Sequence, residues 1–146
     1  MEVAVILTSH GLFAQEALNS AQMIAGYEFE NCGVVSVTEG KDYATCLAEL
    51  QALYSSLNTE AGVLVLCDIY GGTPANISTY LAIEHPEVMV YTGFNLPILL
   101  EVLLTRQGSS IEEISAKVEE VHSLSLTNIR EALKGDGGDG DQMDTY

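Results

Sequence analysis

Four short apolar segments recur along the chain, separated by longer segments of mixed polarity. Near-continuous runs of valine, isoleucine and leucine are typical of strands that are covered on both faces of a parallel sheet. The pattern predicts buried strands at residues 3–7, 33–37, 62–67 and 88–92. The run at 62–67 is almost uninterrupted, which favours a central position for this strand.

The segments between these strands carry apolar residues at helical spacing. Gly26 is expected to end the first helix, and Asp42 is expected to cap the second. In the third helix, Thr73 suits the N-cap position and Pro74 suits the first helical position. The predicted helices are residues 13–25, 43–57, 74–84, 97–105 and 111–121.

The alternation of strands and helices determines the expected fold class. Each connection between strands is long enough for a crossover helix, which parallel neighbours require. A chain of 146 residues is also the usual size of one domain. We therefore expect a single doubly wound α/β domain, with a mostly parallel sheet and helices on both faces.

The last residues of the chain have a different composition. Residues 135–146 consist largely of glycine and aspartate, with only Met143 and Tyr146 to bury. Such a segment cannot offset the entropy of becoming ordered, so we expect a disordered acidic tail. Its aspartates lack the twelve-position pattern of a calcium-binding EF-hand loop.

The net charge of the chain restricts its partners. Five lysines and arginines stand against 21 aspartates and glutamates, which gives a formal net charge of −16. This balance argues against nucleic acid or an anionic membrane as a partner and favours a positively charged protein. Solubility alone would explain the acidity equally well.

The sequence also bears on location and on metal binding. No apolar run approaches the roughly 18 to 20 residues that span a bilayer, and Glu2 stands where a signal peptide would be basic. We therefore expect a cytoplasmic protein. Cys32, Cys46 and Cys67 lack metal-site spacing and are expected to be reduced thiols of the core, so neither a metal nor another cofactor is predicted.

Candidate functional residues follow three of the predicted strands. Ligands of open α/β sheets bind at the carboxyl ends of the strands, so we expect these residues to face one crevice. They are His10 between Ser9 and Gly11, Asp68 with the turn Gly71, Gly72 and Thr73, and Asn95.

These residue types together indicate phosphate chemistry. The imidazole of His10 is a capable nucleophile near neutral pH, and Asp68 is the best-placed carboxylate to orient it. If Asp68 holds Nδ1, then Nε2 is the nucleophile. The Gly71 to Thr73 turn precedes a helix N-terminus, where backbone N–H groups favour a phosphate.

Each of these features taken alone has an ordinary structural explanation. Capping would account for Thr73, and a single histidine or aspartate at a strand end is more often structural than catalytic. A nucleophilic pair of Ser9 and His10 is not expected, because neighbours on a strand point to opposite faces. His85 is expected to be exposed to solvent, and His122 to be exposed or at an edge.

Three segments together resemble a known family. Residues 3–11 (VAVILTSHG), 63–76 (VLVLCDIYGGTPAN) and 93–101 (GFNLPILLE) are similar to the mannose-family IIA (EIIA) domain of the bacterial sugar phosphotransferase system. The likeness covers about residues 1–134. A histidine at a strand end, followed by Asp-x-x-Gly-Gly-Thr-Pro, is a specific combination.

The resemblance implies a cytoplasmic homodimer that carries phosphate. It would accept a phosphoryl group from the histidine phosphocarrier protein HPr and pass it to EIIB, which serves a permease of EIIC and EIID. The active histidine would be His10, the orienting aspartate Asp68, and the phosphate-contacting turn Gly71 to Thr73, with Asn95 in the third loop. The family also has an antiparallel fifth strand, exchanged between subunits, so that the sheet would have four or five strands. Residues 128–134 would have to supply it here, although their pattern is helical.

Two other functions remain open on the sequence alone. The phosphotransferase subunit of a dihydroxyacetone kinase has a similar fold and also carries phosphate on an N-terminal histidine. A non-catalytic regulatory module that binds an anion in the same pocket is the second alternative. The sugar served by a phosphotransferase system of this kind is not expected to be encoded in this chain.

Overall fold

The computed structural model describes residues 1–135 and contains a four-stranded sheet. The strands are β1 (Ala4–His10), β2 (Cys32–Val37), β3 (Val63–Cys67) and β4 (Val88–Thr92). Their order is β2-β1-β3-β4, and every neighbouring pair is parallel. The predicted α/β class, parallel sheet and internal position of β3 are therefore confirmed.

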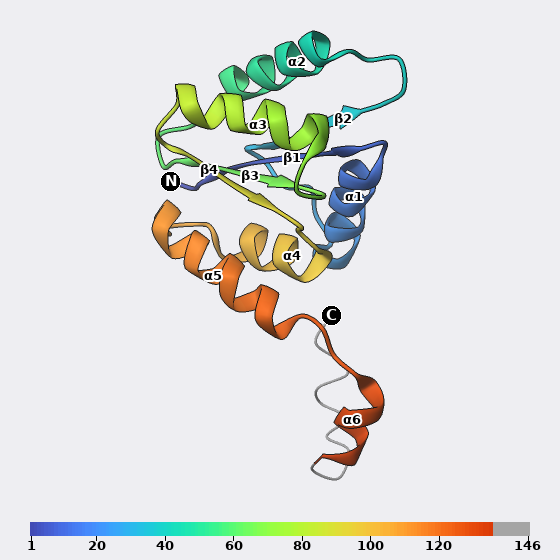
Figure 1. Cartoon of the computed structure of the whole chain (residues 1–146). Coiled ribbons are helices and arrows are strands. Elements are labelled where there is room, and N and C mark those ends of the chain that lie inside the picture. Colours follow the sequence, from blue (N-terminus) through green and yellow to red (C-terminus); the bar gives the residue numbers. More distant parts are fainter. Residues whose placement is uncertain (136–146) are drawn as a thin grey trace.

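Helices cover both faces of this sheet (Figure 1). The helices are α1 (Phe13–Ala25), α2 (Tyr43–Ser56), α3 (Gly72–Glu84), α4 (Leu96–Thr105), α5 (Ile111–Leu124) and α6 (Ile129–Lys134). Figure 1 shows α2 and α3 on one face and α1, α4 and α5 on the other, with α6 standing away from the body. In the part of the chain described, no helix is both long and apolar enough to cross a membrane.

The sheet divides the core into two layers, and β1 contributes side chains to both of them. Val5 and Leu7 are buried in the cluster beneath α1, α4 and α5, whereas Ala4 and Ile6 are buried in the cluster beneath α2 and α3. Successive side chains of a strand point to opposite faces, so a strand covered on both sides must be apolar throughout. This requirement explains the continuous apolar run at the start of the chain.

The first strand is longer than the sequence predicts. The apolar run ends at Leu7, but β1 continues through Thr8 and Ser9 to His10. Thr8 pairs with residues of both β2 and β3, so hydrogen bonding within the sheet extends the strand beyond its apolar part. The extension carries His10 to the carboxyl-terminal edge of the sheet.

The start of α3 also differs from the prediction. Gly71 is the N-cap, Gly72 is the first helical residue, and no side chain caps this helix. The prediction that Thr73 is the N-cap is therefore wrong. Gly71 and Gly72 have φ values of +91° and +82°, a backbone that favours glycine and that turns the chain into the helix before Thr73 is reached.

The other helix ends follow the sequence signals closely. Gly26 ends α1 in the left-handed conformation, and the Asp42 side chain accepts a hydrogen bond from the Thr45 N–H at the start of α2. The helical interpretation of residues 128–134 is confirmed by α6. The predicted acidic tail, apart from Gly135, lies outside the described residues.

A buried arginine joins several elements at the amino-terminal end of the sheet. Arg106 follows α4, and only 2% of its surface is exposed. Its Nη1 donates to the Val3 carbonyl at 3.1 Å and to the Asn31 carbonyl at 3.0 Å, and its Nη2 donates to the Glu30 carbonyl. These hydrogen bonds compensate for burial of the charge and hold the starts of β1 and β2 beside α4.

Replacing Arg106 with methionine is expected to lower the free energy of unfolding by about 3 kcal/mol, because its hydrogen bonds to the carbonyls of Val3, Glu30 and Asn31 and its ion pair with Glu2 are lost. Urea unfolding followed by circular dichroism measures this change. Lys117→Met is the control, since Lys117 makes a partly exposed ion pair with Glu101 whose loss costs less than about 1 kcal/mol. Equal losses in the two variants would contradict the structural role of Arg106.

Candidate phosphate site at the carboxyl end of the sheet

A histidine and an aspartate meet at the carboxyl-terminal edge of the sheet. His10 is the last residue of β1, and Asp68 directly follows the neighbouring strand β3. Asp68 Oδ2 lies 2.9 Å from Nδ1 of His10 and also accepts a hydrogen bond of 2.9 Å from the His10 backbone N–H. The His10 side chain is 50% exposed and that of Asp68 is 13% exposed. Asp68 thus holds His10 from the buried side of the pair, while the imidazole of His10 is accessible to solvent.

The environment of Asp68 favours its charged form. Burial opposes ionisation of this carboxyl, but hydrogen bonds from the backbone and ring of His10 and from the Ile69 N–H outweigh it. Together they hold the pKa of Asp68 below its ordinary value. Near neutral pH Asp68 is therefore a carboxylate, which only accepts hydrogen bonds.

This charge determines which ring nitrogen of His10 is free. Because the carboxylate only accepts, Nδ1 of His10 is the ring nitrogen that carries the proton and donates it to Asp68. In the neutral ring, Nε2 then has an unshared electron pair. The sequence predicts Nε2 as the nucleophile if Asp68 holds Nδ1, and the geometry meets this condition.

The turn before α3 packs directly against the ring of His10. A Cβ atom on Gly72 would lie 2.9 Å from both Cε1 and Nε2 of His10, whereas one on Gly71 would meet nothing within 4 Å. Gly72 therefore lets the backbone approach the ring. Since no side chain caps α3, its first N–H groups and the positive end of its dipole are available beside Nε2. This is a suitable arrangement for a phosphate group on that nitrogen.

Two residues that are predicted to line the site, Ser9 and Asn95, have side chains that are hydrogen-bonded to other elements. Ser9 is fully buried, and its Oγ accepts a hydrogen bond of 2.8 Å from the Ala14 N–H at the start of α1. Asn95 is the N-cap of α4, and its Nδ2 donates to Ser125 Oγ at 2.8 Å. Neither residue makes a hydrogen bond to His10 or Asp68 in the described structure. Both residues lie close to the end of a strand, and their side chains accept hydrogen bonds from N–H groups at the start of the helix that follows.

The remaining site residues lie in the loops beside His10. Gly11 has a φ of +59°, and its N–H donates to the Val37 carbonyl of β2 at 2.9 Å. This bond turns the chain away from β1 directly after His10. Thr73 is half-buried at the second position of α3. His10, Asp68 and Gly72 are thus the predicted residues that the fold brings into direct contact.

The other two histidines lie apart from this site. His85 is half-buried, rather than exposed as predicted, because its ring stacks on Tyr54 at a centroid distance of 4.2 Å. Its Nδ1 also lies 3.8 Å from Glu87 Oε1. Sequence reasoning took the charged turn around His85 as solvent-exposed and missed the aromatic residue that covers it from α2. The prediction of an exposed position for His122 is confirmed.

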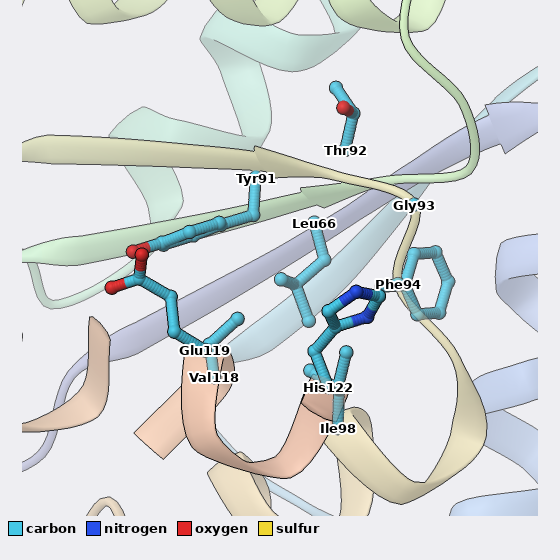
Figure 2. A pocket seen from close by; sticks show the side chains of 9 residues that line it. All are labelled: Leu66, Tyr91, Thr92, Gly93, Phe94, Ile98, Val118, Glu119 and His122. Carbon is cyan, nitrogen blue, oxygen red and sulfur yellow. The ribbon is translucent and has the colours of Figure 1, made fainter. Parts of the chain in front are cut away.

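A separate cavity lies on the face of the sheet that α4 and α5 cover (Figure 2). It has a volume of about 310 Å³ and is lined mainly by apolar and aromatic side chains. Figure 2 shows His122 and Glu119 reaching it from α5, with Tyr91 coming from β4. Neither His10 nor Asp68 lines this cavity. Sequence reasoning gave no signal for it.

Comparison with known proteins identifies a family that covers most of the chain. The family model described as "PTS system fructose IIA component" matches residues 4–119. The mannose-specific EIIAB component of Escherichia coli strain K12 is 32% identical over 134 residues, which are 92% of this chain and 39% of that protein. The chain thus spans less than half of the length of this relative.

Relatives of similar length match along most of both chains. The fructose-specific EIIA component of Bacillus subtilis is 30% identical over 132 residues, covering 90% of each protein. Among solved structures, a mannose/sorbose-specific IIA subunit from Enterococcus faecalis has a TM-score of 0.78 at 30% identity, covering 88% of this chain and 95% of that one. The sequence comparisons and the structural comparison therefore indicate the same family.

Adding one methyl group to Gly72 is expected to displace the imidazole of His10. In Gly72→Ala the new Cβ would overlap the ring, so the ring ¹H and ¹⁵N NMR signals of His10 should shift and its bond to Asp68 should weaken. Gly71→Ala is the control, because it also places a side chain on a backbone of positive φ but has open space around the Cβ. Unchanged His10 signals in Gly72→Ala would contradict the close packing.

Proposed function

The chain belongs to the EIIA-man family of phosphotransferase-system IIA components, and on this basis we propose that it carries a phosphoryl group on Nε2 of His10. The observation that carries the proposal is the environment of that nitrogen. Asp68 occupies Nδ1, and Nε2 faces the glycine turn at the N-terminus of α3. The nucleophile and the phosphate-binding backbone are therefore adjacent.

Phosphorylation of His10 is a transfer between two imidazoles. The electron pair of Nε2 attacks phosphorus, the bond from phosphorus to the donor's ring nitrogen breaks, and that electron pair remains on the donor ring. The proton on Nδ1 stays in place and is shared with Asp68. Positive charge develops on the His10 ring as the new bond forms, and the carboxylate of Asp68 stabilises this charge.

The phosphoryl oxygens are held by the backbone of the turn. The N–H groups at the start of α3 donate to them, and the positive end of the helix dipole offsets their charge. Catalysis in such transfers consists mostly of positioning and electrostatic stabilisation. The reaction needs neither a metal nor another cofactor. Among residues 1–135, no cluster of three histidine, cysteine, aspartate or glutamate side chains is suitable for a metal.

The partners in this proposal are proteins. The donor is the histidine phosphocarrier protein HPr, and the acceptor is an EIIB component that serves a permease of EIIC and EIID in the membrane. The relay itself works in the cytoplasm. Relatives are named for mannose, fructose and sorbose, which supports a carrier whose own site is independent of the sugar.

This function is favoured over the two alternatives. The named relatives are sugar phosphotransferase components, which supports EIIB rather than a dihydroxyacetone kinase as the acceptor. A non-catalytic anion-binding module has no need for an oriented imidazole. The charged Asp68 on Nδ1 and the open Nε2 therefore support a phosphoryl carrier.

We further propose that the protein is a homodimer. Residues 125–134 leave the body of the molecule, and no residue of α6 is buried. Leu126 is 96% exposed, and Ile129 and Leu133 are exposed as well. A six-residue helix is too short to be stable alone, so a partner surface is needed to cover its apolar side chains.

Replacing His10 with alanine is expected to abolish phosphorylation by HPr, enzyme I and radiolabelled phosphoenolpyruvate. The wild type should acquire a phosphate that is labile in acid and stable in base, as expected of phosphohistidine. Asp68→Asn should slow labelling at least about 100-fold, because the amide favours the wrong tautomer. Both rates are measured by rapid-quench labelling.

His85→Ala and His122→Ala are the matched controls, since both histidines lie outside the site, and they should be labelled normally. Persistent labelling of His10→Ala would reject the assignment. Adding either an EIIB protein or the dihydroxyacetone kinase subunit to the labelled wild type identifies the acceptor. Transfer to the kinase alone would reverse the preferred order of functions.

Replacing apolar side chains of the C-terminal arm is expected to convert the dimer to a monomer. Leu126→Ser combined with Ile129→Ser removes apolar surface that is exposed in the single chain, so dissociation should be stronger than in the wild type. Sedimentation velocity at micromolar concentration gives the mass. Ile83→Ser, which changes an exposed apolar side chain on α3, is the control. A monomeric wild type would contradict the homodimer.

A further inference from the structure

The start of α3 needs a precise position if its N–H groups are to bind phosphoryl oxygens on His10. Gly71 and Gly72 both have positive φ, and no side chain caps the helix. The turn before α3 thus offers no side chain that could fix the helix along its axis. Donors to a phosphoryl group must lie about 2.7 to 3.1 Å from its oxygens, so a small shift of this helix would weaken their hydrogen bonds.

Two buried polar side chains join α3 to the neighbouring strand. Cys67 is the last residue of β3, Ser78 lies in α3, and both are fully buried. Cys67 Sγ donates to Ser78 Oγ at 3.3 Å, and Ser78 Oγ donates to the Pro74 carbonyl at 2.7 Å. Cys67 Sγ also lies 3.7 Å from the same carbonyl. We call Cys67, Ser78 and the Pro74 carbonyl the strand–helix link.

The hydrogen bonds of this link run in one direction. Burial raises the pKa of the Cys67 thiol to about 11, so the thiol keeps its proton near neutral pH. Cys67 can therefore donate to Ser78, and the hydroxyl proton of Ser78 goes to Pro74. Replacing either side chain with alanine would break the connection between β3 and the first turn of α3.

Both ends of the link adjoin the reacting groups. Cys67 directly precedes Asp68, and Pro74 is two residues after Gly72. Asp68 holds Nδ1 of His10, and the backbone of Gly72 packs against the same ring. The link therefore ties the glycine turn to the strand that carries the orienting carboxylate.

The strand end of the link is itself fixed by the sheet. The Cys67 carbonyl accepts hydrogen bonds from the N–H groups of Gly93 and Phe94, at 3.0 Å and 3.3 Å, in the loop after β4. On its other side Cys67 pairs with Thr8 of β1. Cys67 thus has a neighbour on each side of β3 and gives α3 a fixed point of attachment.

Apolar packing alone specifies the position of α3 less sharply. Ile77 and Leu81 are buried in the core layer beneath α2 and α3 and hold the helix on the sheet. Apolar contacts are non-directional, whereas a hydrogen bond requires a particular distance and angle. This difference matters at a reacting centre, where a misplacement of about 1 Å can cost about 100-fold in rate.

We propose that Cys67 and Ser78 are positioning residues that hold the N-terminus of α3 in place for the phosphoryl group on His10. This inference rests on the proposed function. Neither side chain touches the phosphate, and both act through the first turn of α3. Without the link, the N–H groups of α3 meet the transition state less well, while His10 and Asp68 keep their own hydrogen bond.

Single-turnover transfer from phosphorylated HPr, measured by rapid quench, tests this role. In Ser78→Ala the maximal rate should fall about tenfold, while the half-saturating concentration of HPr changes less than about twofold, because the protein surface is unaltered. Cys67→Ala should behave in the same way. Ile77 and Leu81 still pack α3 on the sheet, so both variants should give the circular dichroism spectrum of the wild type.

Thr79→Ala is the matched control on the same helix. Thr79 Oγ1 donates to the Ala75 carbonyl four residues earlier, as Ser78 does to Pro74, but it makes no hydrogen bond to β3 within residues 1–135. Ser115→Ala removes a buried hydroxyl from α5 and controls for the loss of a buried polar group. Both controls should transfer at the wild-type rate. Slowing of either control to the rate of Ser78→Ala would overturn the positioning role.

Two further variants separate positioning from a general loss of stability. Cys67→Ser keeps a donor at this position, so its maximal rate should lie within about threefold of the wild type. Cys67→Ala combined with Ser78→Ala should be no slower than the slower single variant, since both side chains act through one link. Losses that multiply to about 100-fold, or a Cys67→Ser rate as low as that of Cys67→Ala, would overturn the link.

Phosphoramidate, a small direct phosphoryl donor, shows whether chemistry or docking is impaired. Ser78→Ala should be labelled by it about tenfold more slowly than the wild type, because the defect lies beside Nε2. The ³¹P NMR signal of phosphorylated His10 should also shift in Ser78→Ala and stay unchanged in Thr79→Ala. An unchanged rate in Ser78→Ala would overturn the positioning role and leave the proposed function intact. A wild type that neither donor labels would reject the proposed function itself.

Discussion

The hydrogen bond between Asp68 and Nδ1 of His10 is the interaction on which the site depends. It exists because β1 and β3 are parallel neighbours in register, with Thr8 opposite Cys67, so the residues that follow emerge side by side. Together with the hydrogen bonds from the backbone N–H groups of His10 and Ile69, this bond lowers the pKa of Asp68, and it fixes the proton of the ring on Nδ1. A change in strand order would separate the two residues by a whole strand spacing and remove both effects.

The rest of the fold supplies the rigidity that this bond requires. β1 and β3 are buried on both faces, and their apolar side chains fill two separate core layers. Strands packed in this way cannot shift in register without exposing apolar surface. Two successive glycines with positive φ then turn the chain between β3 and α3, and this turn brings the backbone of Gly72 against the ring of His10.

Sequence reasoning succeeded where local pattern and fold make the same demand. Buried parallel strands must be apolar throughout, so apolar runs in the sequence predict them. The carboxyl ends of parallel strands lie at one edge of the sheet, which predicts that His10 and Asp68 are close together. It did not reveal the partners that the side chains take up in the fold. Ser9 and Asn95 are predicted to line the site, and the structure adds that the start of α1 and the start of α4 use them as hydrogen-bond acceptors. His85 was read as exposed because nothing in its turn reveals that Tyr54 stacks on it from α2.

The half-exposed position of His10 has a consequence for the kind of chemistry it serves. A closed pocket would surround a phosphoryl group with donors and exclude water, but it would also prevent another protein's imidazole from reaching Nε2. At the open edge of the sheet, His10 is accessible to another protein but is not shielded from water. One side of the ring is held by Asp68 and Gly72, and the other side is left for a partner. In the proposed function, the partner completes the enclosure during transfer, so the surface around His10 contributes to the site that we propose.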